Sequence, residues 1–352
     1  MNTLRNYPEF RDHPLADMAA AEVSKRLEGY VQSTFLHELI ARVAEERGVD
    51  VPDIHDEASF FDAAQLAFDF RNGKAREDIS VADLSEGTKQ QLHELIDAFA
   101  MRRETEPTEF AADMVFIPGA AGMVPANRLA YFAELEESGK LSTPNVVLIG
   151  SERPVNMVPN GIGLTEIDRA GLAGYSSGGT VAKTEFDIMR NTAASAYGIQ
   201  DSDWETITGR DPEVPPQYQG EYRVAHTKVG AQDIFVVSAP MLDEDRISPN
   251  GTPRTRANTI DGYLLMMKLI NPKKEDTLRA VVVTDAVFTP FQQIDAQKAF
   301  APIGVEVETV GFTREHAGMS DDWPGGDAYY LQELLSTFRS TRFARDQLAD
   351  TK

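Results

Sequence analysis

Apolar side chains in residues 1–107 recur at the spacing of helices. The stretch AEVSKRLEGYVQSTFLHELIARVAEERG (21–48) carries apolar or aromatic residues at steps of three and four, which predicts an amphipathic helix that ends at Gly48. Two further helices are predicted in this part, with Ser59 and Ser85 as their N-caps. Nothing here resembles a catalytic constellation. We expect residues 1–107 to act as a cap, a lid or an oligomerisation surface.

The pattern changes beyond this region to short β-rich runs that alternate with amphipathic segments. The strands predicted by this pattern are 113–118, 145–151, 222–230, 232–240, 278–287 and 304–312. The helices predicted between and after them are 126–138, 184–197, 257–270, 290–301 and 327–345. Alternation of this kind is typical of an α/β domain, which we place at residues 108–352.

Several of these strands are continuous apolar runs rather than alternating ones. Such runs indicate burial on both faces, as in a mostly parallel sheet that is covered by helices. The stretch EYRVAHTKVGAQDIFVVSAP instead resembles a hairpin, which predicts an antiparallel edge. We therefore predict an α/β fold with a mostly parallel sheet, an α-helical N-terminal region and an insertion around 200–232.

The composition of the chain argues against nucleic-acid and membrane partners. Of the 352 residues, 34 are Lys or Arg and 56 are Asp or Glu, which gives a formal net charge of −22. A surface this acidic repels nucleic-acid backbones, so we expect no nucleic-acid partner. No stretch approaches the ~20 apolar residues that cross a bilayer, and the N-terminus lacks the apolar core of a secretory signal. We expect a cytoplasmic chain with no membrane partner.

The sequence contains no cysteine and six scattered histidines. The absence of cysteine excludes disulfides, thiolate metal sites and a Cys nucleophile. No two histidines have the spacing of a helical metal site. Proton transfer or metal binding would therefore depend on carboxylates.

Ligands of open parallel sheets bind beyond the carboxyl ends of the strands, where the chain turns toward the helices. The first such turn is VFIPGAAGMVPANR, in which Gly119 and Gly122 would let the backbone approach an anion and Arg128 follows. An ordinary strand-to-helix turn that contacts no ligand would have the same sequence features. The second is IGSERP, which offers Ser151 and Arg153 as ligand contacts.

A Gly- and Ser-rich stretch, GLAGYSSGGTVAKTEFD (171–187), precedes a predicted helix with Thr184 as its N-cap. It suits a lid over a substrate, or simply a mobile loop. Glu185 and Asp187 occupy the first helical turn, where the helix dipole already favours acids. Glu185 at such a junction is also a candidate general base or metal ligand.

The remaining two turns carry further polar residues. RTRANT contains Arg256, Asn258 and Thr259 just before a helix, and its arginines suit an anionic ligand or pair with nearby acids. The stretch VVTDAVFTPFQQ ends the most apolar strand with Thr284 and Asp285 and reaches Gln293 at the next helix. We regard Asp285 as a second candidate catalytic acid, and Thr284 and Gln293 as ligand contacts.

These turns together resemble those of the domain-of-unknown-function 218 family (the SanA/ElyC/YdcF group). The resemblance covers roughly 111–345 and rests on VFIPGAAGMVPANR, VVLIGSERP, TEFD, RANT and VVVTDAVFTPFQ. It implies a Rossmann-like three-layer sandwich and a cleft lined by Arg128, Glu185, Asn258 and Thr259. The chain departs from the family after the last of these strands. Where members usually carry a His followed by an Arg, it has Phe288 and then Gln292 or Gln293.

Our leading hypothesis is an enzyme that hydrolyses or transfers a group of a small phosphorylated or nucleotide-like substrate. Glu185 or Asp285 would handle the proton or a divalent metal, and Mg²⁺ is the metal to test first because it takes oxygen ligands. The alternative is a non-catalytic sensor that binds a nucleotide or an adenosyl compound. A nicotinamide-dependent dehydrogenase is less consistent with the sequence, because the GxGxxG fingerprint is missing.

Overall fold

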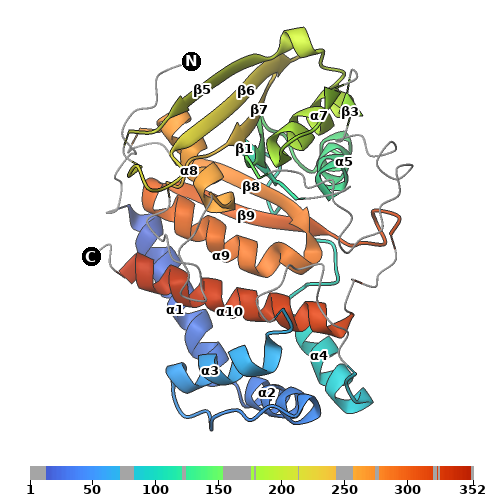
Figure 1. Ribbon diagram of the computed structural model, residues 1–352, viewed down its shortest axis with the longest axis vertical. Coiled ribbons are helices and arrows are strands. Elements are labelled where there is room, and N and C mark those ends of the chain that lie inside the picture. The colour runs from blue at the N-terminus through green and yellow to red at the C-terminus, as the bar shows by residue number, and fades with distance from the viewer. Residues whose placement is uncertain are drawn as a thin grey trace. The chain divides into compact units, whose positions relative to one another are not determined.

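The computed structural model (Figure 1) describes residues 13–71, 83–120, 124–153, 176–177, 180–212, 214–242, 257–273, 277–319, 323 and 326–349. Contacts divide the chain into two compact units that interleave along the sequence. The first unit comprises Met1–Leu15, Glu106–Thr284 and Ala299–Val310, and the second comprises Ala16–Thr105, Asp285–Lys298 and Gly311–Lys352. The division into 1–107 and 108–352 is drawn along the chain rather than from contacts, and it stays a prediction.

The structure is an α/β fold. Its strands are β1 (Met114–Pro118), β2 (Asn145–Gly150), β3 (Ser176–Ser177), β4 (Thr180–Val181), β5 (Glu205–Arg210), β6 (Glu221–Val229), β7 (Gln232–Ser238), β8 (Leu278–Asp285) and β9 (Val305–Phe312). Its α-helices are α1 (Pro14–Val31), α2 (Thr34–Arg47), α3 (Glu57–Phe68), α4 (Glu86–Ala98), α5 (Val124–Glu137), α7 (Glu185–Tyr197), α8 (Thr259–Ile270), α9 (Thr289–Phe300) and α10 (Asp327–Ala349). The six predicted strands and the five predicted helices of 108–352 are confirmed.

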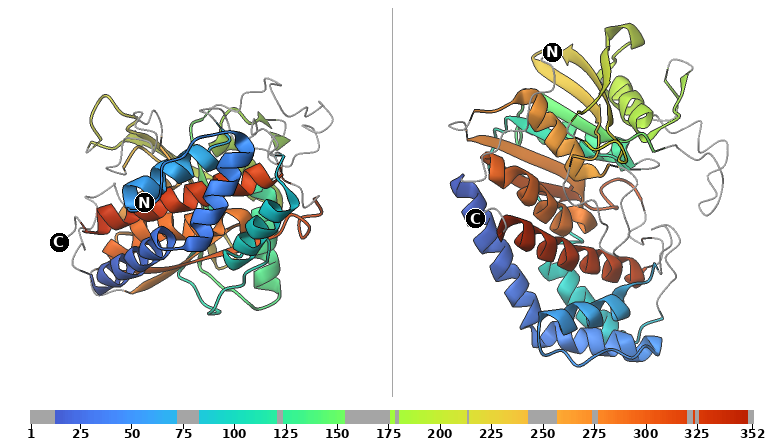
Figure 2. Two further views of the ribbon diagram at one scale, coloured as in Figure 1. Left: turned by 90° about the horizontal axis from the view of Figure 1, so that it is seen from below. Right: turned by 60° about the vertical axis from the view of Figure 1, so that its left-hand side comes forward.

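A seven-stranded sheet has the order β5-β6-β7-β2-β1-β8-β9. β1 pairs in parallel with β2 and β8, and β2 pairs in parallel with β7. β6 pairs antiparallel with both β5 and β7, and Figure 2 shows these strands continuing the sheet beyond β7. Counted in their own sequence, the strands from β7 to β9 have the order 3-2-1-4-5 of a doubly wound sheet. The predicted mostly parallel sheet with an antiparallel edge is confirmed.

The helices of the first unit cover the sheet in the way that its strand order requires. Right-handed crossovers from β1 to β2 and from β2 to β7 run in one direction, whereas the crossover from β7 to β8 runs back. α5 and α7 therefore share one face and lie side by side in Figure 1, and α8 covers the other. On the α8 side, the Phe116 ring packs 5.1 Å from the rings of Tyr263 and Phe300, measured between centroids.

The second unit has its own apolar core, built from helices near both ends of the sequence. α10 packs on α3 and α4, as Figures 1 and 2 show. Phe338 of α10 is fully buried, and its ring lies 5.0 Å from the Tyr30 ring and 5.5 Å from the Phe60 ring. The N-terminal helices thus share a core with the last helix of the sequence.

Two details of the N-terminal helices differ from the prediction. The segment 21–48 is not one helix, because it breaks between α1 and α2, where the Ser33 side chain accepts a hydrogen bond from the backbone N–H of Leu36. The N-cap of α3 is Asp56 rather than Ser59, which is the third residue of the helix and completes a capping box. Gly48, in the left-handed conformation, and Ser85 end and begin their helices as expected.

The insertion around 200–232 contains β5, which the sequence pattern did not predict. All of its residues are exposed or half-buried, so β5 lacks the apolar alternation that reveals other strands. Within the described residues, no helix is long and apolar enough to span a membrane.

Candidate functional site

The carboxyl ends of the central strands lie level with one another. Pro118 of β1 pairs with Ile149 of β2, and Gly150 of β2 pairs with Ser238 of β7. Phe116 pairs with Val282, so Thr284 of β8 lies level with Pro118. The four turns named from the sequence therefore start from one edge of the sheet, the edge where doubly wound folds bind their ligands.

Two glycines at this edge are required by close approach of the backbone. A Cβ atom at Gly119 would lie 2.3 Å from the carbonyl oxygen of Ile149. A Cβ atom at Gly150 would lie 2.7 Å from the Cα atom of Phe186. Gly119 thus lets β1 end against β2, and Gly150 lets the first turn of α7 sit directly on the end of β2. The close approach of Phe186 to Gly150 places Glu185 at this edge of the sheet.

Ser151, Arg153 and Glu185, all named from the sequence, meet at this point. The Ser151 hydroxyl donates a hydrogen bond of 2.5 Å to Oε2 of Glu185, and Nη1 of Arg153 lies 3.4 Å from Oε1. The backbone N–H groups of Glu185 and Phe186 donate to the carbonyl oxygens of Arg153 and Ser151. The Glu185 side chain is 17% exposed and that of Arg153 is 47% exposed. A sheltered carboxylate therefore lies beside a hydroxyl and an accessible guanidinium group.

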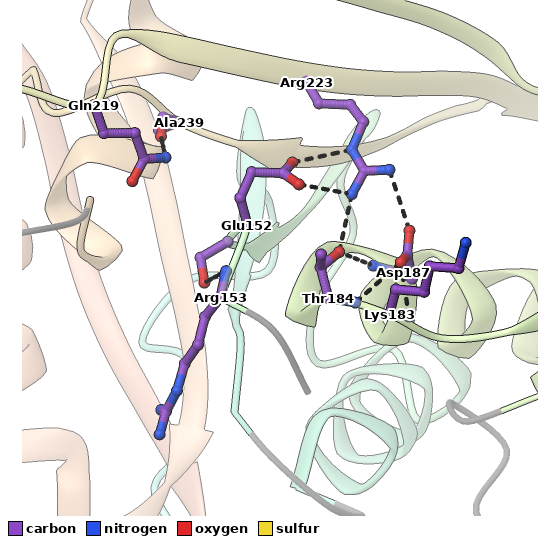
Figure 3. A network of polar contacts seen from close by, with 9 residues as sticks. Glu152, Arg153, Lys183, Thr184, Asp187, Gln219, Arg223 and Ala239 are labelled. Atoms are coloured by element: carbon purple, nitrogen blue, oxygen red, sulfur yellow. Dashed lines mark hydrogen bonds and ion pairs between the residues drawn. The ribbon is translucent and has the colours of Figure 1, made fainter. Parts of the chain in front are cut away.

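Arg223 of β6 fastens this arrangement to the sheet. Its guanidinium group binds both carboxylate oxygens of Glu152, at 3.0 and 3.1 Å, and also contacts Asp187 at 3.2 Å and Thr184 at 2.9 Å. It lies 3.8 Å above the centre of the Phe186 ring. Figure 3 shows the guanidinium group between Glu152 on one side and the start of α7 on the other. We call the following residues the α7 junction: Ser151, Glu152, Arg153, Thr184, Glu185, Phe186, Asp187 and Arg223.

The two acids at the start of α7 have different surroundings. Asp187 and Thr184 form a capping box, in which Asp187 accepts hydrogen bonds from the backbone N–H groups of Lys183 and Thr184. Asp187 therefore serves to cap the N-terminus of α7. Glu185 is held by side chains of the loop after β2 instead. Of these two acids, Glu185 is the one placed to act on a bound molecule.

Arg128 and Asn258 support the edge from either face of the sheet. Arg128 is 2% exposed, and its Nη1 atom donates to the carbonyl oxygens of Pro118 and Gly119 at 2.8 and 3.5 Å. Asn258 is the N-cap of α8 and Thr259 is the first residue of that helix. The Asn258 side chain accepts from the backbone N–H of Asp261. Both side chains stabilise a turn at the carboxyl edge, and their contact with a ligand stays a prediction.

Thr284 and Asp285 end β8 and are 0% and 1% exposed. Within the described residues, the hydroxyls of Thr284 and Ser238 have no hydrogen-bond partner. Gln293 is half-buried in α9. The ligand-binding and catalytic roles of Thr284, Asp285 and Gln293 stay predictions.

Part of the predicted site falls outside the described residues. Gly122 and Arg256 lie there, as do positions 171–175 and 178–179 of the segment 171–187. Across the described part of the chain, no group of three or more His, Asp or Glu side chains is placed to hold a metal ion.

Sequence reasoning missed Glu152 and Arg223. Glu152 stands between two residues that were chosen, so its position in the turn was the available signal. Arg223 lies 71 residues further along the chain, in a strand that was read as one half of a hairpin. Only the pairing of β6 with β7 and of β7 with β2 brings Arg223 to this edge.

No protein family, curated protein or solved structure matches this chain. The resemblance to the domain-of-unknown-function 218 family therefore stays a prediction.

Proposed function

We propose that this protein is an enzyme that hydrolyses, or transfers a group of, a small phosphorylated or nucleotide-like substrate at the carboxyl edge of β1, β2 and β7. The observation that carries the proposal is the contact between Ser151 and Glu185, with Arg153 beside them. A carboxylate that accepts a hydrogen bond from a hydroxyl is placed to accept a proton from that hydroxyl or from an attacking water. The Arg153 guanidinium group suits an anionic substrate group.

The first turns of the three helices also support an anionic ligand near β1. α7 begins with Glu185 and Asp187, and α8 carries Asp261 in its first turn. The first turn of α5 has no acidic residue. An anion is favoured at a helix N-terminus that acids do not already occupy. The substrate anion would therefore lie at the turn between β1 and α5, next to Gly119, while Glu185 approaches from α7.

In the proposed reaction, Glu185 takes a proton from the attacking water or hydroxyl, and Arg153 pairs with the substrate anion. If Glu185 instead bound Mg²⁺, the metal would neutralise negative charge on the substrate. A non-catalytic sensor for a nucleotide or adenosyl compound is the second candidate. It is supported by the ion pairing within the α7 junction, where Arg153 is paired with Glu185, and Arg223 with Glu152 and Asp187.

A ligand panel tests the proposal. The melting temperature of the protein is measured with nucleotides, sugar phosphates and adenosyl compounds, with and without Mg²⁺, and each ligand that raises it is examined for product. We expect Glu185→Gln to abolish turnover and to leave the melting temperature without ligand nearly unchanged, because Gln retains an acceptor for Ser151. Glu137→Gln, on the exposed face of α5, is the matched control and should retain full turnover.

The possible results of these experiments separate the enzyme, the sensor and a purely structural role of Glu185. Binding without product in the unsubstituted protein supports the sensor. A panel with no stabilising ligand contradicts both candidates. A Glu185→Gln protein that loses stability and keeps its turnover would show that Glu185 serves only to start α7.

A further inference from the structure

The Ser151 side chain is held in one orientation by the groups around it. Its hydroxyl donates to Oε2 of Glu185 at 2.5 Å, and its oxygen accepts the backbone N–H of Arg153 at 3.1 Å. The backbone carbonyl oxygen of Ser151 accepts the N–H of Phe186 at 3.0 Å, which holds the residue against the start of α7. A hydroxyl oxygen has one proton and two lone pairs. Because Glu185 engages the proton and Arg153 engages one lone pair, the second lone pair is directed away from both groups.

The two groups that contact the Ser151 hydroxyl are those that a nucleophile requires. An alcohol is a weak nucleophile unless a neighbouring base accepts its proton. The Glu185 carboxylate is in direct contact with this proton, and its side chain is only 17% exposed to water that could compete for it. The backbone N–H of Arg153 stabilises the negative charge that develops on Oγ as the proton leaves. Ser151 is therefore already arranged for activation.

The Arg153 side chain supplies positive charge beside the same hydroxyl. Its Nη1 atom lies 3.4 Å from Oε1 of Glu185, and the side chain is 47% exposed. A guanidinium group offers further N–H donors that suit phosphoryl oxygens. When Glu185 takes the Ser151 proton, its carboxyl group loses its charge and attracts Arg153 less strongly. The guanidinium group can then pair with the phosphoryl group that Ser151 attacks.

Building on the proposed function, we propose that Ser151 is the nucleophile and that the reaction passes through a phosphoserine. In the first step, Oγ of Ser151 bonds to phosphorus and the bond from phosphorus to the leaving oxygen breaks. The Ser151 proton passes to Glu185 and from there to the leaving oxygen. In the second step, water attacks phosphorus, the bond to Oγ breaks, and Glu185 returns a proton from the water to Oγ. An acceptor alcohol in place of water gives group transfer.

A fluorophosphonate tests the nucleophile before the substrate is identified, because an activated hydroxyl displaces its fluoride and retains the phosphonyl group. The mass of the intact protein counts the adducts, and peptide mapping places them. We expect one adduct, on Ser151, which Ser151→Ala abolishes. Glu185→Gln should slow the labelling by about 100-fold or more, because it removes the base. The melting temperature of each variant without the probe shows whether it is folded.

Ser85 is an internal control in the same digest. Its hydroxyl also donates to a glutamate, Glu46, at 2.5 Å, but it belongs to the second unit, where it is the N-cap of α4. Ser85 should stay unmodified, and Glu46→Gln should leave the labelling of Ser151 unchanged. Labelling of Ser85 at the rate of Ser151 would overturn the proposal. So would an unmodified Ser151, or a Glu185→Gln protein that is labelled as fast as the parent.

The ligand panel separates this proposal from the proposed function. An adduct on Ser151 in a protein that makes no product from any ligand of the panel would support Ser151 as a nucleophile and contradict the proposed substrate class. Product formed by the Ser151→Ala protein at the rate of the parent would overturn the nucleophile. That result would leave the proposed function standing, with direct attack by water.

Discussion

Arg223 and Glu152 are 71 residues apart in the chain and meet through two hydrogen bonds of 3.0 and 3.1 Å. A guanidinium group that binds a carboxylate in this way fixes both its distance and its orientation. Because the same group also contacts Asp187 and Thr184, the loop after β2 and the start of α7 are held to one side chain of β6. Glu185, the proposed base, is the first residue of α7 and contacts Ser151 of that loop.

Arg223→Gln should lower the free energy of unfolding by about 1–2 kcal/mol, because it leaves the partly buried Glu152 and Asp187 without their cation. Urea unfolding followed by circular dichroism measures this loss. Lys140→Gln is the control, since its pair with Glu106 is about half exposed on both sides, and it should change stability by less than about 0.5 kcal/mol. Equal effects of the two substitutions would contradict an anchoring role for Arg223.

Gly150→Ala should destabilise the protein by about 1–3 kcal/mol, because the new methyl group would overlap the backbone of Phe186 and push α7 off the end of β2. Gly29→Ala provides a comparison of opposite sign. Gly29 lies in α1 with no atom within 4 Å of an added Cβ, so this change should stabilise by about 0.5–1 kcal/mol. Melting temperatures of both variants check the two signs. A Gly150→Ala protein as stable as the parent would show that α7 does not need this close approach.

Lys268 of α8 and Asp211 form a buried ion pair at 3.0 Å, with side chains that are 4% and 2% exposed. Lys268→Met should cost about 3–5 kcal/mol, because Asp211 is then left buried without its cation. The double variant Lys268→Met, Asp211→Leu should be more stable than the single one, because it removes the uncompensated charge as well. A double-mutant cycle in urea measures the coupling. Additive losses would contradict this account.

The raised pKa of Glu136 predicts that the stability of the protein depends on pH. Burial raises the pKa of the Glu136 carboxyl above its ordinary value of 4.5, and the hydrogen bond from Gln232 only partly opposes this. The folded protein therefore binds this proton more tightly than the unfolded chain does. The resulting stabilisation is present below pH 4.5 and is lost as the pH rises through the raised pKa.

Glu136→Gln keeps an acceptor for Gln232 and removes the titration. Its melting temperature relative to the parent should therefore be higher near about pH 8 than near about pH 4. The neighbouring Glu137 is exposed, and Glu137→Gln should show the same offset from the parent at both pH values. An offset for Glu136→Gln that does not change with pH would contradict the effect of burial.

The sequence predicted the strands of the parallel sheet because residues such as those of β1 and β8 are buried on both faces and form unbroken apolar runs. It missed β5, an edge strand whose side chains meet water. It also missed the break at Ser33, because the apolar spacing of α1 continues into α2 and hides the turn. The spacing of apolar residues indicates which positions are buried. It does not indicate where one helix ends when a second helix follows directly.

The sequence could name candidate site residues only where they lie in the turn that directly follows a strand or precedes a helix. Ser151, Arg153 and Glu185 were named as candidates because a parallel sheet brings the ends of its strands to one edge, and their roles stay predictions. Arg223 was not, because its role depends on which strand pairs with which across the sheet. The burial of Arg128 was also hidden, since its partners are backbone carbonyl groups that no sequence pattern marks.

The central position of β1 has a consequence for how this protein is made. One edge of β1 pairs with β2, which soon follows it on the ribosome, whereas the other pairs with β8, more than 150 residues later. Until β8 emerges, a nascent chain carries an apolar strand with an open edge, which is the kind of surface that invites aggregation during synthesis. Chaperones that shield such edges should therefore raise the yield of this protein more than that of one whose strands pair in order of translation.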